Sequence, residues 1–473
     1  MLVRMAEAFD LARRYRDFLD AVFGGLAEPS AHGWSGSYGE LDLQSLWFAG
    51  EFGDQFETTE GRRIVLRDFG VWNHSAGPDF TGCAVDCDGE ILRGDIELDP
   101  DVRDWERHGH GANDNYERVI LHLFTTTPEA RVFTRTREHR EVIQVQLKPE
   151  MLRDAARPRH QAEARLGRCA TPLRELDETR VSSMIEAAAQ YRLKRKGERL
   201  RALEGIHGRA QMVYQSLATT LGYRNNQRAF TVLTQRLPLK MMLKLDEAER
   251  EALLFGVSGF LESVRYEDTE PETRKYLRGL WSDWWKQRGS YASWLTDEQR
   301  VRWQIAGGRP GNHPQRRLGA LGALLNVWRN VFSILQTAKK WNRKVFAEAM
   351  LSLTHDYWSW HYTLLAEPPK KAVALIGDTR VQEMLANVVY PLLLPERAEL
   401  WTEFKDLPAL LDNQKVRRAS LRLFGEPSPR TRHFQKRIYQ QQGLLQIYED
   451  YCLEDDSACA ECPFPEKLKE WRQ

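Results

Sequence analysis

The stretch from residue 77 to residue 99 reads GPDFTGCAVDCDGEILRGDIELD. It contains two apolar runs, 80–85 and 90–98, joined by Asp88-Gly89, a dipeptide that favours the tight turn of a β-hairpin. Successive side chains of a strand point to opposite faces. One face therefore carries Ile91, Arg93, Asp95, Glu97 and Asp99, and the other carries Leu92, Gly94, Ile96 and Leu98. We therefore expect a hairpin whose second strand presents a row of carboxylates, at Asp95, Glu97 and Asp99.

A further carboxylate, Asp79, immediately precedes the first of these strands. If the two strands are neighbours, the side chains of Asp79 and Glu97 converge. Paired carboxylates supply the oxygen ligands that hard cations such as Mg²⁺ or Mn²⁺ require. A cation held in this way can activate water and stabilise phosphoryl oxygens. The residues therefore predict a metal site at Asp79 and Glu97, which Asp95 or Asp99 completes.

Two histidines follow the hairpin, in the run Asp104-Trp105-Glu106-Arg107-His108-Gly109-His110. With His122 nearby in the sequence, His108 and His110 could ligate a transition metal. They could also position a phosphate or a water molecule beside the acids. In the third interpretation they hydrogen-bond an ordered loop, in which Asp104 caps a short helix.

The segments around the hairpin indicate an α+β domain followed by helices. Helical periodicity is found at 6–23 and 41–56, before strand signals at 64–66, 80–85, 90–98, 119–124, 131–134 and 142–147, with one short helix around 104–117. Further helices are expected at 182–203, 211–221, 227–237, 246–261, 317–337 and 345–353. We expect an α+β domain over residues 1–160, a helical domain over 175–450 and a cysteine-containing tail over 451–473.

The composition is that of a soluble globular protein. The 473 residues are 42% hydrophobic and 29% charged, which allows two or three domains with sizeable cores. No stretch approaches the roughly 18 apolar residues of a membrane helix, and the first ten residues lack the apolar core of a signal peptide. We therefore expect a cytoplasmic location and no membrane partner.

Two basic stretches stand out, although the net charge of +1 provides no global attraction to nucleic acid. The first lies on one predicted helix, and the second is interleaved with aromatic residues. Basic side chains give salt-dependent affinity for phosphates, and exposed aromatic rings can stack on bases. Solvated helix faces are the alternative. The residues concerned are Arg192, Lys194, Arg195 and Lys196 in the first stretch, and Arg417, Arg418, Arg430 and Arg432 in the second.

Three of the six cysteines crowd the C-terminus, as Cys452-x6-Cys459-x2-Cys462. Cys-x2-Cys beside a third cysteine is typical of a metal site in a reducing compartment. Cys169, just after the α+β domain, is the expected fourth ligand. Four thiolates would suit Zn²⁺ or an iron–sulfur cluster equally. The alternative is three unligated thiols on a tail, while Cys83 and Cys87 are expected in the strand core.

The two acidic motifs, Gly77-Pro78-Asp79-Phe80 and Gly94-Asp95-Ile96-Glu97-Leu98, resemble those of the PD-(D/E)XK nuclease superfamily. The resemblance covers the first third of the chain. It implies a restriction-endonuclease-like αβββαβ core, Mg²⁺-dependent phosphodiester hydrolysis and one more carboxylate from an early helix, for which Glu51 has the matching position. The lysine of the usual pattern is replaced by Asp99. Some nucleases of this type are similar in holding an iron–sulfur cluster with one distant cysteine and a closing group of three.

A wider set of motifs resembles an uncharacterised bacterial family with a domain of unknown function. Besides the acidic motifs, these are Asp104-Trp105, His108-Gly109-His110, Asp114, Tyr116, Val119-Ile120-Leu121-His122, Arg309-Pro310-Gly311-Asn312-His313-Pro314, Tyr451-Cys452, Cys459 and Cys462-Pro463-Phe464. This second resemblance covers most of the chain.

The leading interpretation is a metal-dependent nuclease that acts on DNA or RNA. The second is a protein that binds nucleic acid or an unidentified protein partner through a catalytically degenerate nuclease core. The third is a metal-dependent hydrolase of a small molecule, centred on His108 and His110. No phosphate-binding Gly-x4-Gly-Lys-Ser/Thr loop and no Gly-x-Ser-x-Gly nucleophile motif occurs in the sequence.

Overall fold

The turn of the expected hairpin sets the centre of the fold. In the computed structural model, Asp88 and Gly89 have φ angles of 49° and 95°, and Cys87 pairs with Glu90 across them. Two consecutive left-handed residues are the requirement of the tightest hairpin turns, so the prediction is confirmed. The structure describes residues 10–23, 40–48, 52–53, 55–68, 71–73, 77–126, 132–148, 151, 167–262, 269–296, 299–305, 310–410, 414–425, 428–452, 459 and 462–471.

The strands of the described residues form one mixed sheet. They are β1 (Gln55–Glu57), β2 (Arg63–Asp68), β3 (Val71–Trp72), β4 (Phe80–Cys87), β5 (Glu90–Asp99), β6 (Val119–Phe124) and β7 (Ile143–Gln146). Their order is β1-β2-β4-β5-β6-β7, and β3 pairs with β4. Neighbours from β1 to β5 are antiparallel, whereas β5, β6 and β7 are parallel. The fold is therefore α+β in its N-terminal part.

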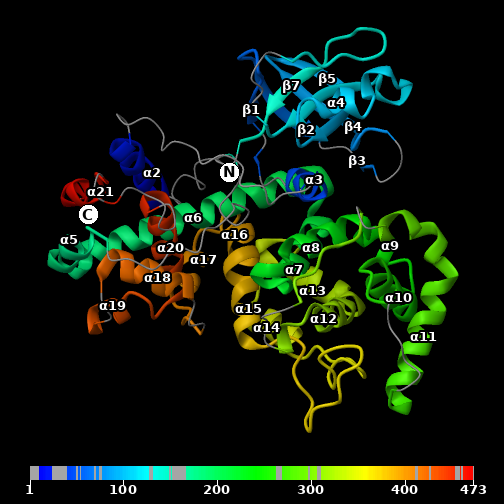
Figure 1. Cartoon of the computed structure of the whole chain (residues 1–473). Helices are drawn as coiled ribbons and strands as arrows, with labels where there is room; N and C mark the ends of the chain where they lie inside the picture. Colours follow the sequence, from blue (N-terminus) through cyan, green and yellow to red (C-terminus); the bar gives the residue numbers. More distant parts are fainter. Residues whose placement is uncertain are drawn as a thin grey trace.

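Helices make up most of the remaining chain (Figure 1). Before and within the sheet region they are α2 (Asp10–Phe23), α3 (Glu40–Phe48) and α4 (Asp104–Arg107). After it come α5 (Ala170–Glu175), α6 (Glu178–His207), α7 (Arg209–Leu221), α8 (Tyr223–Arg236), α9 (Leu239–Met242), α10 (Glu247–Val257), α11 (Pro271–Gln287), α12 (Pro314–Asn326), α13 (Trp328–Leu335) and α14 (Arg343–Leu351). The last are α15 (Asp378–Met384), α16 (Tyr390–Leu393), α17 (Leu400–Lys405), α18 (Gln414–Phe424), α19 (Pro429–His433), α20 (Ile438–Cys452) and α21 (Phe464–Lys467).

One apolar core joins the sheet to the helical region. The aliphatic face of β5, with Ile96 and Leu98, packs in the same cluster as Leu43 and Trp47 of α3. Val232 of α8 belongs to that cluster as well. Figure 1 shows α3 between the sheet and the helices below it. The opposite face of β5 is thus left for its acids, which are covered by the segment that follows the strand.

Three expected elements differ in the structure. The helix expected over 41–56 ends at Phe48, and the last two residues of the expected range belong to β1. The helix expected over 317–337 is broken by a bend of 77° between α12 and α13. The strand expected over 131–134 is absent from its described residues, 132–134, and the chain there forms only an isolated bridge between Arg135 and Glu141.

No single helix among the described residues is long and apolar enough to cross a membrane, and one bent pair, α12 with α13, passes by length and composition alone.

Candidate metal centre

Asp79 and Glu97 are interlocked at the junction of β4 and β5. The backbone N–H of Asp79 donates to Glu97 Oε2 at 2.9 Å. In return, the N–H of Leu98 donates to Asp79 Oδ2 at 2.9 Å. These bonds follow from the strand register, which places Phe80 opposite Ile96. The two acids that the sequence places 18 residues apart therefore share one site, in which Glu97 is buried and Asp79 is half-buried.

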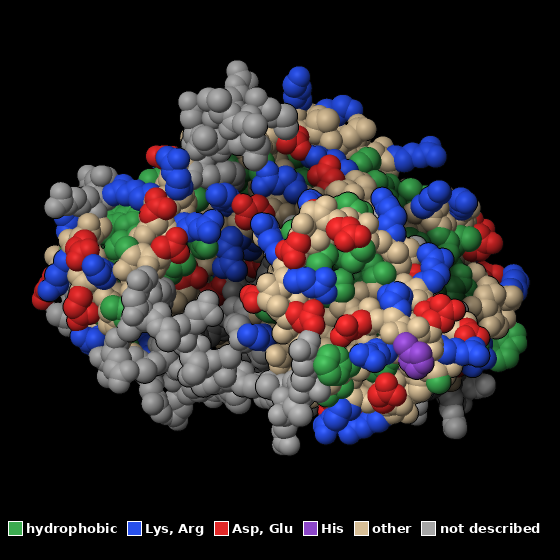
Figure 2. Space-filling model, turned by 90° about the horizontal axis from the view of Figure 1, so that it is seen from above, with side chains coloured by type: hydrophobic (Ala, Val, Ile, Leu, Met, Phe, Trp, Pro, Cys, Tyr) green, Lys and Arg blue, Asp and Glu red, His purple; other side chains and the backbone are tan. Residues whose placement is uncertain are grey.

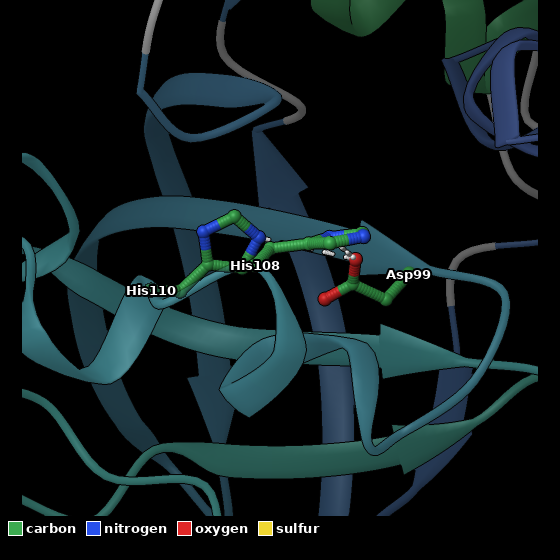
Figure 3. A group of neighbouring side chains, drawn as sticks. All are labelled: Asp99, His108 and His110. Carbon is green, nitrogen blue, oxygen red and sulfur yellow. Dashed lines mark ion pairs between the residues drawn. The ribbon is translucent and has the colours of Figure 1, made fainter.

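The side chains of Asp99, His108 and His110 lie close together in the same site (Figure 3). One ligand atom from each of Asp99, His108 and His110 lies within 4.8 Å of the other two. His108 Nδ1 is 3.4 Å from Asp99 Oδ1. His110 Nε2 is 3.2 Å from Glu97 Oε1 and 3.9 Å from Asp99 Oδ1. His110 thus reaches the inner acid pair, while the half-exposed His108 lies at the surface.

The loop that carries the histidines is fixed by its aromatic residues. Gly109 has a φ of 73°, which ends α4 and turns His110 back toward the sheet. The His110 ring stacks on Tyr116 at 4.0 Å between centroids, and Trp105 meets it edge-on at 5.5 Å. Trp105 Nε1 donates to the carbonyl of Arg135 at 3.0 Å. The ring of His110 is therefore held in one orientation by packing.

Asp99 is oriented by a buried chain of hydrogen bonds from β6 and β7. His122 Nε2 lies 3.1 Å from Asp99 Oδ2, and its Nδ1 lies 2.8 Å from Thr134 Oγ1. A carboxylate only accepts, so the neutral ring carries its proton on Nε2 and Thr134 donates to Nδ1. Gln144 Nε2 donates to the same Thr134 oxygen at 2.6 Å. Such outer partners fix the orientation of a metal-binding group.

The helix α3 contributes a carboxylate that sequence reasoning missed. Gln44 Nε2 donates to Asp79 Oδ1 at 2.6 Å and to Glu40 Oε1 at 3.0 Å. Glu40 and Gln44 are four residues apart, so they share one helix face, and this spacing is the signal that could have identified them. Glu51, the helix carboxylate expected from the nuclease resemblance, lies outside the described residues.

The site concentrates negative charge without a basic partner. Among the described ion pairs, none joins a Lys or Arg to Asp79, Glu97 or Asp99. Burial, with the charges of Glu97 and Glu40, raises the pKa of Asp79 well above its usual range. Burial and the charge of Asp99 likewise raise the pKa of Glu97. The buried acids therefore need protons or a cation.

An unsatisfied nitrogen points into the same cluster. His110 is 7% exposed, and its buried Nε2 has no hydrogen-bond partner despite the nearby carboxylate oxygens. Burial lowers the pKa of His110, although the charge of Asp99 opposes this. A neutral imidazole nitrogen beside carboxylate oxygens is a suitable donor set for a divalent transition metal.

Asp95 lies on the same face of β5 but has a local structural contact. Its Oδ1 accepts from the N–H of Gly82 at 3.0 Å. Gly82 has a φ of 72° at the irregularity where β4 shifts register against β5. Asp95 thus satisfies a backbone donor that the bulge leaves unpaired in the ladder.

The basic stretches make contacts within the helical region. Arg192 of α6 lies 3.0 Å from Glu449 of α20, and Lys196 donates to Gln442 at 2.7 Å. Arg195 is 3.8 Å from the same Glu449, and Lys194 is partly buried on α6.

In the second stretch, Arg430 donates to the carbonyls of Leu173 and Leu176, and Arg432 is exposed. Arg417 and Arg418 lie on α18. Figure 1 shows α18 and α19 at the other side of the molecule from the sheet.

The four cysteines expected to act together lie in one region of the helical core. Cys169 and Cys452 are buried, and Cys459 and Cys462 are partly exposed. Cys83 and Cys87 lie apart from them, in the core of β4, as expected.

Comparison with known proteins gives one match. The family described as Protein of unknown function (DUF2851) matches residues 40–405, a range that contains the whole sheet and the acid and histidine cluster. No curated protein and no solved structure gave a significant match. The match spans well over half of the sequence, which confirms the expected uncharacterised family. The chain therefore belongs to the DUF2851 family of proteins of unknown function.

Proposed function

We propose that this protein is a metal-dependent hydrolase that cleaves phosphodiester bonds in nucleic acid. The observation that carries the proposal is the convergence of Asp79, Glu97 and Asp99 with His110 in one cluster, in which no Lys or Arg of the described residues forms an ion pair with these acids. Its opening is marked by the half-exposed His108. The cluster has the donors of a metal centre and access from solvent at one side.

These side chains favour a divalent cation that binds both oxygen and nitrogen ligands, such as Mn²⁺. Mg²⁺, which would be bound by the carboxylate oxygens alone, is the alternative. Asp79 and Glu97 would hold it on the inner side, and Asp99 and His110 on the outer side. A bound cation supplies a more acidic water and a positive charge for phosphoryl oxygens. The orphaned Nε2 of His110 supports this fit, because a ligated nitrogen needs no hydrogen-bond donor.

Roles for the protein's own groups follow from their exposure and contacts. His108 is 47% exposed in its side chain and lies beside Asp99, so it can exchange a proton with a reacting group at the surface. His122 keeps Asp99 in position through its buried Nε2–H. Gln44 holds Asp79 and Glu40 toward the same point.

The order of elements also supports a nuclease-like core. Helix α3 precedes antiparallel strands β2, β4 and β5, the short helix α4 follows, and β6 adds parallel to β5. We infer from this order a distant relation to the αβββαβ core that the nuclease resemblance implies, although β1, β3 and β7 extend the sheet beyond it. Asp99 occupies the place of the usual lysine, and the adjacent His108 offers a replacement for its proton-transfer role.

A polyanionic substrate would require contact with basic side chains. Figure 2, which views the molecule from above, shows Lys and Arg side chains spread over this face and interspersed with Asp and Glu. Neutralisation of phosphates by such side chains gives affinity that weakens with salt.

A small-molecule hydrolase is the second candidate, and the group of Asp99, His108 and His110 favours it. Two histidines and one carboxylate leave open coordination positions on a transition metal, to which a small substrate could bind. The choice between the two functions depends on the size of the substrate that is cleaved.

The deciding experiment measures cleavage by the purified full-length protein. The substrates are single- and double-stranded DNA and RNA and a small phosphodiester, each with Mg²⁺ or Mn²⁺. Asp79→Asn should abolish cleavage, and His108→Gln should slow it by about 100-fold or more. Glu90→Gln, an exposed acid at the other end of β5, is the matched control and should leave the rate unchanged. Binding of nucleic acid with no cleavage of any substrate would contradict the proposal. Cleavage of the small ester alone would establish the second candidate.

A further inference from the structure

Four of the six cysteines meet in space although three separate segments carry them. Cys169 directly precedes α5, Cys452 is the last residue of α20, and Cys459 and Cys462 come just before α21. Cys169, Cys452 and Cys462 border one apolar core, the residue before Cys169 contacts the sulfur of Cys459, and all four cysteines are free of disulfide bonds. Chance burial of cysteine does not explain this gathering, because two of the four are partly exposed.

The segments that carry the cysteines are fastened to one another by Arg168. Its backbone N–H donates to Cys459 Sγ at 3.3 Å. Its side chain donates to the carbonyl of Cys462 at 3.1 Å and to Glu466 at 2.5 Å. The backbone N–H of Cys462 donates to the carbonyl of Cys459 at 3.4 Å. These contacts hold the segment before Cys169 against Cys459 and Cys462.

A glycine and a buried arginine complete the surroundings. The N–H of Gly167 donates to the carbonyl of Arg422 at 3.0 Å, and a Cβ on Gly167 would lie only 2.4 Å from that oxygen. The segment before Cys169 can therefore approach α18 this closely only with glycine. The guanidinium of Arg422, a residue 5% exposed, hydrogen-bonds Cys452. A buried positive charge at this point offsets the net negative charge of a four-thiolate centre.

We propose that Cys169, Cys452, Cys459 and Cys462 bind a thiophilic metal centre, either a single zinc ion or an iron–sulfur cluster. Both use the same four-thiolate chemistry. Zinc takes four thiolates in a tetrahedron, whereas a cluster attaches each thiolate to a different iron, so the metal content distinguishes the two.

The centre would tie the C-terminal segment to the start of the helical region. The cysteines border a core that α2, α6, α20 and the residues after Pro463 build together. There Tyr451 stacks on Phe464 at 4.0 Å, and Phe18 of α2 meets Trp471 edge-on at 5.3 Å. Figure 1 shows α2, α5, α20 and α21 together at one end of the molecule. Because the unfolded chain lacks a preformed site, metal binding adds directly to the stability of this end.

The test uses the full-length chain, purified without oxygen after expression with iron or zinc. Metal analysis should give about four irons per chain or about one zinc, and a cluster should add absorption in the visible range. Cys459→Ser and Cys462→Ser, at partly exposed positions, should each lower the metal content at least about fivefold and lower the melting temperature. Cys87→Ser, in the strand core, is the matched control and should retain the metal.

X-ray absorption of the unmodified protein keeps the proposal testable if a variant fails to fold. A sulfur-only ligand shell supports the centre, whereas the carboxylate and histidine site would give oxygen and nitrogen neighbours. This contrast also separates the inference from the proposed hydrolase activity. Wild-type protein that contains neither metal after reconstitution with Zn²⁺ or with Fe²⁺ and sulfide would overturn the proposal. Full metal content in a Cys459→Ser, Cys462→Ser double variant would overturn it as well.

Discussion

Glu97→Gln should stabilise the metal-free protein and remove its response to metal. The Glu97 side chain is 7% exposed, and its Oε2 accepts from the N–H of Asp79 at 2.9 Å. Glutamine keeps the shape and this acceptor. Its amide can also donate to His110 Nε2, which has no hydrogen-bond partner. The substitution therefore removes one charge from a buried like-charged cluster without opening a cavity.

The size of the effect can be estimated from the contacts of His110. Glu97 Oε1 and Asp99 Oδ1 lie 3.2 and 3.9 Å from the same nitrogen. The two oxygens are therefore at most about 7 Å apart, where the repulsion is about 2 kcal/mol at an effective dielectric constant of about 20. Solvent and side-chain relaxation reduce the net gain, so we expect the free energy of unfolding to rise by about 1–2 kcal/mol. A cation at about 100 times its dissociation constant should add about 2.7 kcal/mol to the wild type only.

The assay is urea unfolding followed by tryptophan fluorescence, in EDTA and in saturating Mn²⁺. Glu90→Gln, the same change at the exposed end of β5, should stay within about 0.5 kcal/mol of wild type and keep the Mn²⁺ response. The reasoning fails if Glu97→Gln is less stable than wild type in EDTA and is stabilised by Mn²⁺ to the same extent.

Three further changes test other parts of the structure. His122→Phe keeps a buried ring but removes the hydrogen-bond donor to Asp99, so the affinity for Mn²⁺, measured by titration, should fall by about 10–100-fold. An unchanged affinity would show that His122 does not orient a metal ligand. Gly443→Ala should lower the free energy of unfolding, measured by thermal unfolding, by about 1–3 kcal/mol, because the added Cβ would lie 2.1 Å from the carbonyl oxygen of Ile185. The control is Gly205→Ala, whose Cβ would have nothing within 4 Å and which should be neutral or stabilising. Burial lowers the pKa of His355, but the hydrogen bond and charge of Glu251 raise it more, so the net shift is upward. The stabilising contribution of His355 is therefore complete below about pH 6.5 and is lost as the pH rises through the raised pKa. His355→Asn should lower the free energy of unfolding more at about pH 6 than at about pH 9. The opposite order would refute the pairing of His355 with Glu251.

The parts of the fold that follow from local sequence were predictable. The Asp88-Gly89 turn and the alternation along β5 depend only on neighbouring residues, and both fix which face carries the acids. To predict the convergence of Asp79 and Glu97, one further assumption was required, namely that the two consecutive strands pair antiparallel. The cysteine spacing likewise pointed to one region, where the four thiols gather.

Contacts between distant segments were not predictable in the same way. The four-residue spacing of Glu40 and Gln44 shows that they share a helix face, but that this face meets Asp79 depends on how α3 packs against the sheet, which is a tertiary contact. Asp95 looked equivalent to Glu97, but a register shift in β4 gives it a backbone partner. Arg192 belongs to a basic run, yet its partner Glu449 lies 257 residues away.

The position of α3 gives the candidate metal site an influence beyond the sheet. One face of this helix carries Gln44, which contacts Asp79, while Leu43 and Trp47 pack in the core shared with Val232 of α8. The metal-free site contains several buried acids, whose repulsion acts on the end of α3 that carries Glu40. A bound cation would remove that repulsion and hold α3 against the sheet. We therefore expect metal to protect amide hydrogens of α3 from exchange as well as those of β5, because the helix transmits the stabilisation to the junction with the helical region.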